Sequence, residues 1–355
     1  MWHHTRVTQL LGIQYPIMQG PFGGGYSTPA LTAAVSNEGG MGGYGAYTLS
    51  PEEIADVCGQ IRALTARPFA VNLWVSDVDG QQYSAADYAA LNTVYKPYFD
   101  ELGLPLPEPP LPVASRFEQQ AEMLLRQRPA VFSFVFGIPS PAILLECRKQ
   151  GISTVGAATT LDEALALEEA GVDMIIASGF EAGGHRPSFL RPAADSLTGT
   201  FALVPQVADR VSVPVIAAGG IADGRGIAAA LTLGADAVQI GTAFLACEES
   251  NAPAVHKAAL FSGRAKHTAL TEAATGRLGR GLANRLSGER TEHAPFPLQG
   301  SYLSTLRKAA LEQGKTDMVT FWAGQAAPLI KHRRAKELFH DLAAQTERIL
   351  GRRAG

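Results

Sequence analysis

Short apolar runs alternate with amphipathic segments along most of the chain. We predict eight buried strands from these runs: PIMQGP (16–21), GMGGYGA (40–46), FAVNLWV (69–75), VFSFVFG (131–137), ISTVGA (152–157), MIIAS (174–178), VPVIAAGG (213–220) and AVQIGTAF (237–244). The runs are continuous rather than alternating, which is typical of parallel strands covered on both faces. Amphipathic helices are predicted between them, including 51–66, 116–127, 162–170 and 224–233.

Two glycines support this alternation of strands and helices. Gly171 follows the helix at 162–170 and Gly234 follows the helix at 224–233, and in both places a strand begins three residues later. A glycine at this position suits a left-handed cap that turns the chain back into the sheet. Eight strands in this order predict an α/β fold, a (β/α)8 TIM barrel. A doubly wound sheet is the alternative, because repeated order alone does not show that the sheet closes.

Two regions depart from the alternation. Residues 76–115 contain the proline-rich stretch ELGLPLPEPPLPV, which is unsuited to a helix or a central strand, and we interpret them as an ordered insertion. Towards the C-terminus, helices are predicted at 301–313 and 331–350. We therefore expect a barrel domain over 1–261 and a smaller, mainly helical cap over 262–355 that partly returns to the barrel mouth.

Composition narrows the possible partners. The chain has 355 residues, 46% of them hydrophobic, and a net charge of −3, so no general attraction to nucleic acid or anionic membranes is expected. Cys58, Cys147 and Cys247 are far apart and suit a reducing cytosol. Neither a secretory signal nor an apolar stretch of membrane-spanning length is visible. These features predict a cytoplasmic protein and leave its oligomeric state open.

The ends of the predicted strands carry the candidate binding residues. In TIM barrels, working residues lie at the carboxyl ends of strands and in the loops that follow. Gly219-Gly220 and Gly241-Thr242 end the last two strands, and exposed backbone amides there favour a phosphate, although tight turns are the alternative. Asn72 and Gln239 bring carboxamides to the same end, where they either pair with backbone or face a heterocycle such as a flavin.

His185 lies in GFEAGGHRP (179–187), directly after the sixth strand. Gly183 and Gly184 allow the backbone to approach a ligand, and an imidazole donates or accepts protons near neutral pH. A loop histidine is more often structural, but its place after a barrel strand favours catalysis. Glu181 and His185 lack further ligands at suitable spacing, so no metal is expected. No Gly-x-Ser-x-Gly elbow indicates a hydrolase.

The chain resembles the nitronate monooxygenases, formerly called 2-nitropropane dioxygenases. The resemblance covers residues ~10–330 in collinear order and rests on PIMQGPFGGGYSTPALTAAVSNEGGMGGYGA, RPFAVNLWV, GFEAGGHR, PVIAAGGIADGRGIAAALTLGADAVQIGTAFL and FWAGQAAPL. The chain length and two segments resemble those of the first of the family's two classes. The segments are FWAGQAAPL and TGRLGRGLANR. The resemblance implies an FMN-binding TIM barrel that oxidises alkyl nitronates, such as propionate 3-nitronate, with O₂ to a carbonyl compound and nitrite.

The resemblance also implies roles for individual residues. His185 corresponds to the active-site histidine, which holds the nitronate and assists beside the flavin. The residues expected to contact or line the FMN site are Gln19, Gly20, Asn72, Ser178, Gly183, Gly219, Gly220, Gln239, Ile240, Gly241, Thr242 and Gln325.

Three positions depart from the family pattern. Ser178 stands where the family has glutamine, Pro187 stiffens the loop after His185, and Phe22 replaces a common methionine. These departures leave the physiological substrate open. The rival functions are an FMN-dependent NAD(P)H:quinone or enoyl-ACP reductase on the same fold, and a non-catalytic barrel that binds a phosphate ligand.

Overall fold

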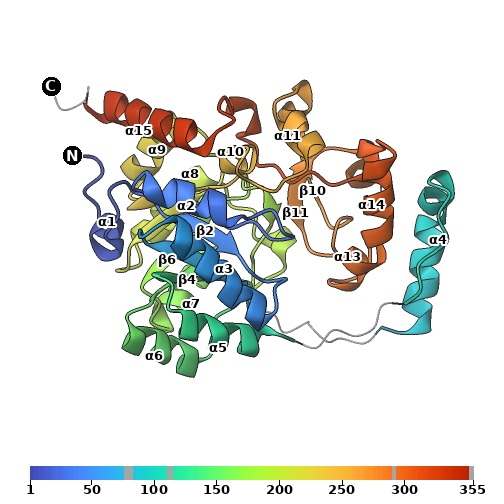
Figure 1. The fold of residues 1–355 in the computed structure, drawn as a ribbon, viewed down its shortest axis with the longest axis horizontal. Helices are drawn as coiled ribbons and strands as arrows, with labels where there is room; N and C mark the ends of the chain where they lie inside the picture. Colours follow the sequence, from blue (N-terminus) through green and yellow to red (C-terminus); the bar gives the residue numbers. More distant parts are fainter. Residues whose placement is uncertain (76–82, 110–114, 290–292, 352–355) are drawn as a thin grey trace.

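Eight parallel strands form the centre of the molecule (Figure 1). The computed structural model describes residues 1–75, 83–109, 115–289 and 293–351. The strands are β1 (Ile17–Gln19), β2 (Gly42–Gly45), β3 (Phe69–Trp74), β4 (Val131–Val135), β5 (Ser153–Ala158), β6 (Met174–Ser178), β8 (Val215–Ala218) and β9 (Ala237–Ile240). Their order is β1-β9-β8-β6-β5-β4-β3-β2, and a parallel bridge between Met18 and Met41 joins the two ends. The predicted TIM barrel is therefore confirmed.

Helices follow the strands and cover the barrel. They are α2 (Pro29–Asn37), α3 (Pro51–Leu64), α5 (Phe117–Gln127), α6 (Pro141–Gln150), α7 (Leu161–Glu169), α8 (Thr200–Ala208), α9 (Gly224–Thr232) and α10 (Thr242–Leu245). Side-chain caps fix several starts, as at Ser50 before α3 and Asp223 before α9. Gly171 and Gly234 have φ of 82° and 101°, so both predicted left-handed turns are confirmed.

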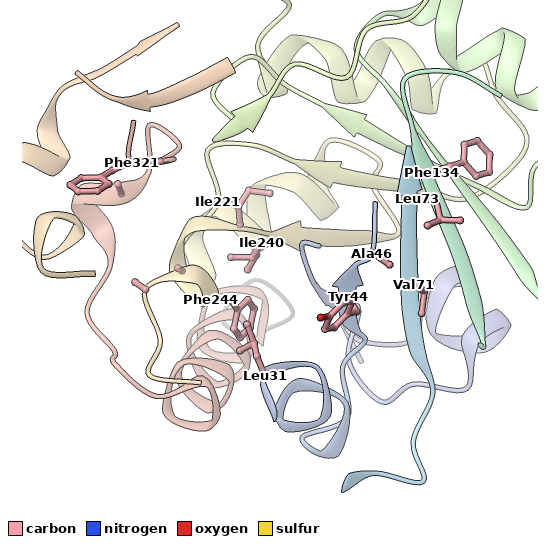
Figure 2. Packing of buried hydrophobic residues seen from close by; sticks show 14 of the residues in the cluster. Leu31, Tyr44, Ala46, Val71, Leu73, Phe134, Ile221, Ile240, Phe244 and Phe321 are labelled. Atoms are coloured by element: carbon pink, nitrogen blue, oxygen red, sulfur yellow. The ribbon is translucent and has the colours of Figure 1, made fainter. Parts of the chain in front are cut away.

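The barrel strands bury side chains on both faces. Inward side chains form one cluster with α1 (Arg6–Leu11), which lies at the amino ends of the strands: Met18, Met41, Ala70, Val131, Val155, Ala157, Met174, Ile176, Ile216, Ala218 and Ala237. The intervening side chains, such as Val71 and Leu73 of β3, pack in the larger outer cluster (Figure 2). This two-residue period explains why the apolar runs are continuous.

A second, three-stranded antiparallel sheet contains β10 (Thr268–Thr271), β11 (Gly279–Leu282) and β7 (Gly184–His185). GFEAGGHRP follows β6 as predicted, but two of its residues, Gly184 and His185, form a short strand that pairs with Arg280 and Gly279. The pairing partner lies far along the chain, so local sequence periodicity carried no sign of it. The edge of this sheet is consequently part of the loop that follows β6.

The remaining helices lie outside the alternation of strands and helices. They are α4 (Ala85–Glu101), α11 (Ala254–Leu260), α12 (Arg285–Gly288), α13 (Leu298–Tyr302), α14 (Ser304–Glu312) and α15 (Ala335–Gly351), with 3₁₀ turns at Ala193–Asp195, Gly263–Lys266, Thr316–Met318 and Ala327–Leu329. The sequence pattern did not predict α4, which lies beside α13 and α14 (Figure 1). Tyr302 Oη donates to Asn92 Oδ1 over 2.7 Å across this contact.

The C-terminal helix α15 packs against α9 and α2 of the barrel. The insertion helix α4, in contrast, contacts the segment that precedes α15, as the 3.0 Å hydrogen bond from Gln313 Nε2 to the Leu102 carbonyl shows. The division of the chain at residue 261 stays a prediction. No helix in the described part of the chain combines the length and apolar character needed to cross a membrane.

Candidate functional site

Polar side chains continue the inward rows at the carboxyl ends of the strands. Asn72 lies two residues after Ala70, and Gln239 two residues after Ala237, so both follow inward-facing positions. Ser178 is likewise in register with Ala218, which is itself paired with Gln239. The barrel geometry therefore places the predicted Asn72, Ser178 and Gln239 at one end of its interior.

Asn72 is buried and has a side-chain partner on the neighbouring strand. Its Nδ2 donates to Ser133 Oγ of β4 over 2.9 Å. The sequence left two partners open for this carboxamide, the backbone or a heterocycle. The Ser133 hydroxyl is neither of these. The bond fixes the orientation of the carboxamide, because the amide nitrogen is held and the carbonyl oxygen must lie opposite to it.

The side chain of Gln19 is occupied by backbone. Its Oε1 accepts from the Gly43 amide over 3.0 Å, and its Nε2 donates to the Gly20 carbonyl. Ile240 packs its side chain in the outer core, and its carbonyl accepts from the Gly20 amide over 2.9 Å. Gln19 and Ile240 thus fix the ends of β1 and β9, and any contribution of Ile240 to a ligand comes through its backbone.

The glycines after β8 and β9 differ in how much open space surrounds them. Gly219 has φ of 105°, and a Cβ there would lie 2.9 Å from Thr200 Oγ1, so the tight turn requires glycine. Gly220 has φ of 72° but is exposed. A Cβ added there would have the Glu181 side chain as its nearest neighbour, 3.6 Å away. Gly241 precedes α10 without a side-chain cap, and its Cβ position is 3.9 Å from Phe22. Open backbone is therefore present at Gly220 and Gly241.

The segment 322–325 lies against two of the predicted binding regions. The Gly324 amide donates to Thr242 Oγ1 over 2.9 Å, and the Gln325 amide donates to the Glu181 carbonyl over 2.9 Å. A Cβ on Gly183 would lie only 2.5 Å from the Gly324 nitrogen. The structure thus brings Gly183, Thr242 and Gln325 together from three distant parts of the chain.

Glu181 has a structural partner. Its carboxylate accepts from the Thr200 amide over 2.9 and 3.0 Å and from the Thr200 hydroxyl over 2.9 Å. Gly199, which precedes α8, has no side chain with which to cap the helix, so Glu181 takes this role. The described residues contain no group of three or more His, Cys, Asp and Glu side chains that could hold a metal ion.

His185 lies among aromatic rings. Its ring centroid is 4.9 Å from that of Trp322 and 5.2 Å from that of Trp74, and Nε2 lies 2.7 Å from Thr275 Oγ1. Burial, followed by the nearby charge of Arg277, lowers the pKa of His185 to about 3. The imidazole is therefore neutral near pH 7, and it offers a hydrogen bond rather than a full positive charge.

Arg277 lies near His185, although the sequence pattern predicts no role for it. Its guanidinium carbon lies 4.0 Å from the ring centre of Phe136 and 4.3 Å from that of Phe296. TGRLGRGLANR supports the resemblance, but its residues alone do not indicate that Arg277 lies near His185. Only the fold shows that β10 and β11 carry Thr275 and Arg277 to the end of β6.

Arg186 anchors the loop that follows His185. Its buried guanidinium donates to the carbonyls of Ser196 over 2.7 and 2.9 Å and Thr159 over 3.3 Å, and also to that of Ser178. Burial lowers the pKa of Arg186 to about 10, so the side chain remains charged at neutral pH. The arginine ties this loop to the ends of β5 and β6.

Comparisons with known proteins agree with this geometry. The sequence profile of the family described as nitronate monooxygenase matches residues 4–345. A probable nitronate monooxygenase of Staphylococcus aureus (strain Newman) is 38% identical over 355 residues, covering 99% of each chain. The structure of nitroalkane oxidase from Streptomyces ansochromogenes has a TM-score of 0.89 at 36% identity and covers 98% of this chain and 99% of its own. FabK from Thermotoga maritima has a TM-score of 0.77 at 29% identity and covers 99% of both chains.

Proposed function

Because the chain belongs to the nitronate monooxygenase family, we propose that it binds FMN and oxidises alkyl nitronates with O₂ to a carbonyl compound and nitrite. The observation that carries this proposal is the position of His185, a partly buried, neutral imidazole beside two tryptophans, next to the carboxyl ends of the barrel strands. An uncharged donor in an apolar setting is suited to an anion that must lose electrons, because it orients the anion without neutralising it.

The residues at the barrel mouth fit FMN. Asn72 and Gln239 bring carboxamides to the interior end of the barrel, where they would meet the edge of the flavin ring. Gly220, Gly241 and Thr242 provide open backbone and a hydroxyl for the phosphate. When bound, FMN supplies the redox chemistry, and the protein supplies binding and orientation.

The side chains around His185 define how a nitronate would be held. Its oxygens are hydrogen-bond acceptors, and the neutral His185 donates to them. The rings of Trp74, Phe136 and Trp322 limit access of water, which strengthens that hydrogen bond. The guanidinium of Arg277 lies close enough to lower the pKa of His185, so its positive charge also attracts an anion.

The test is oxygen consumption and nitrite release with a panel of nitronates, measured on protein whose FMN content is known. We expect nitronate-dependent turnover, and we expect His185→Asn to reduce it strongly while FMN stays bound. Parent-like turnover by His185→Asn would show that the imidazole is not the residue that holds the substrate. Colourless protein that fails to take up FMN would instead favour the non-catalytic phosphate-binding alternative.

The reductase alternative keeps the same fold. The likeness to FabK covers the whole chain but has a lower TM-score and identity than the likeness to nitroalkane oxidase, which makes the reductase the second candidate. Mixing anaerobic protein with NADH or NADPH separates the two functions. Rapid flavin bleaching by the nucleotide would favour a reductase, whereas bleaching by a nitronate alone would favour the oxidase. A cytoplasmic location and the lack of a nucleic-acid partner stay predictions.

A further inference from the structure

The hydroxyl of Thr275 lies 2.7 Å from Nε2 of His185. We propose that Thr275 is a positioning residue that sets the tautomer of His185, by donating its hydroxyl hydrogen to Nε2 so that Nδ1 carries the ring proton. The Nδ1–H group then donates to an acceptor oxygen of the substrate. This inference rests on the proposed function for the identity of that substrate, but the tautomer itself is a property of the protein alone.

The surroundings of the Thr275 hydroxyl favour this direction of donation. The Arg277 amide lies 3.4 Å from Oγ1 and donates to it, so one lone pair of the oxygen is used by backbone. The Arg277 carbonyl, the competing acceptor for the hydroxyl hydrogen, is also 3.4 Å away. The 2.7 Å contact with Nε2 is much shorter, and the hydrogen is best placed there.

The position of the proton decides what the neutral ring can do. A neutral imidazole has one N–H donor and one lone pair, and the hydrogen bond made by one nitrogen sets the state of the other. Since Nε2 accepts from Thr275, the remaining donor is Nδ1. A nitronate presents only acceptor oxygens to this side of the site, so the opposite tautomer would bring two lone pairs together.

The backbone holds both residues in this arrangement. His185 pairs with Gly279 of β11, and the Arg186 amide donates to the Leu278 carbonyl over 2.8 Å. Thr275 lies in the connection between β10 and β11, next to Gly276, whose φ is 83°. A Cβ on Gly276 would lie 2.3 Å from the Ala294 carbonyl oxygen, which shows how closely this turn is packed. The same hairpin therefore fixes the backbone and the ring of His185.

The tautomer can be measured directly by NMR of protein labelled with ¹⁵N-histidine. Two-bond ¹⁵N–¹H correlations distinguish the two neutral tautomers, and the signal that His185→Asn removes identifies His185. We expect the Nδ1–H form in the parent and in Thr275→Ser, and a loss of its dominance in Thr275→Val. An Nε2–H form in the parent, or an unchanged ring in Thr275→Val, would overturn the proposal.

Kinetics with a nitronate provide the second readout. We expect Thr275→Val to lower kcat/KM about 10-fold, the effect of losing one hydrogen bond of ordinary strength, with FMN content unchanged. Thr275→Ser should restore most of the activity, and Thr275→Ala, which removes the same hydroxyl from a smaller side chain, should match Thr275→Val. In a His185→Asn background, Thr275→Val should cause no further loss.

The two readouts separate failure of this proposal from failure of the proposed function. Parent protein that oxidises no nitronate contradicts the function, while the NMR experiment still decides the tautomer. Losses that multiply in the double variant would show that Thr275 acts independently of His185, and this would overturn the positioning role.

Discussion

The Gly324 amide donates a 2.9 Å hydrogen bond to Thr242 Oγ1, which joins the C-terminal part of the chain to the end of the last barrel strand. Thr242 opens α10 at the position where the sequence predicts a phosphate. Since a hydroxyl both accepts and donates, Thr242 can receive the Gly324 amide and still offer its hydrogen to an anion. The predicted phosphate-binding region and the segment 322–325 are consequently coupled through one side chain.

Thr242→Val is therefore expected to weaken FMN binding. Valine removes both the acceptor for the Gly324 amide and the donor for the phosphate, while the size of the side chain is kept. We expect the Kd for FMN to rise about 10-fold, as for the loss of one charge-assisted hydrogen bond. Flavin fluorescence during titration of the apoprotein measures this. Thr242→Ser is the matched control and should bind FMN like the parent; equal Kd values for all three proteins would contradict the role.

Gly183→Ala and Gly184→Ala should differ in their effects for physical reasons. A Cβ on Gly183 would lie 2.5 Å from the Gly324 nitrogen, so the segment 322–325 would have to move away. Gly184 has φ of 82° but open space around its Cβ position, so alanine there costs about 1 kcal/mol of backbone strain.

We expect Gly183→Ala to lose FMN affinity and turnover together, and Gly184→Ala to lose mainly stability. Titration with FMN and urea unfolding of both variants distinguish the two effects. Equal FMN affinity in Gly183→Ala and the parent would show that the contact with Gly324 is not needed for cofactor binding.

The barrel could be predicted because its information is local. Each strand is a short apolar run, and the residue that continues its inward row can be counted, which places Asn72 and Gln239 at the barrel mouth. His185 was likewise found from its place after a strand.

The surroundings of His185 could not be predicted, because they depend on contacts between distant segments. Thr275 and Trp322 reach the imidazole only after β11 pairs with β7. No local pattern in TGRLGRGLANR or FWAGQAAPL reports that pairing. The role of Glu181 as a cap for α8 could not be predicted either, because its partner Thr200 is distant in sequence and comes close only in the folded chain.

Removal of the Glu181 carboxylate should destabilise the protein. Glu181→Ala leaves the first turn of α8 without its cap, and we expect a loss of about 1–2 kcal/mol in the free energy of unfolding. Glu181→Gln keeps an oxygen that can accept from the Thr200 amide, and it should lose less. Urea unfolding compares the three proteins, and Asp162→Ala, at an exposed position with the ion pair to Arg191, is the control. A loss no larger than that of the control would contradict the capping role.

His256 gives the protein a specific dependence of stability on pH. Its buried ring stacks on Phe321 with centroids 4.9 Å apart, and Nε2 donates to the Trp322 carbonyl over 2.9 Å. Burial lowers the pKa of His256 to about 4. The unfolded chain binds a proton on this ring below about pH 6.5, whereas the folded protein does so only near the lowered value. Stability must therefore fall as the pH falls through this window.

His256→Gln should reduce that dependence. Glutamine retains an N–H donor for the Trp322 carbonyl but does not titrate, so the slope of the unfolding free energy should decrease by about 1.4 kcal/mol per pH unit between about pH 6 and pH 4.5. His185, whose pKa is also lowered, maintains part of the slope in the variant. Urea unfolding across this range measures the effect. His267→Gln, at an exposed position, is the control, and an equal slope in the parent and His256→Gln would show that His256 is not responsible.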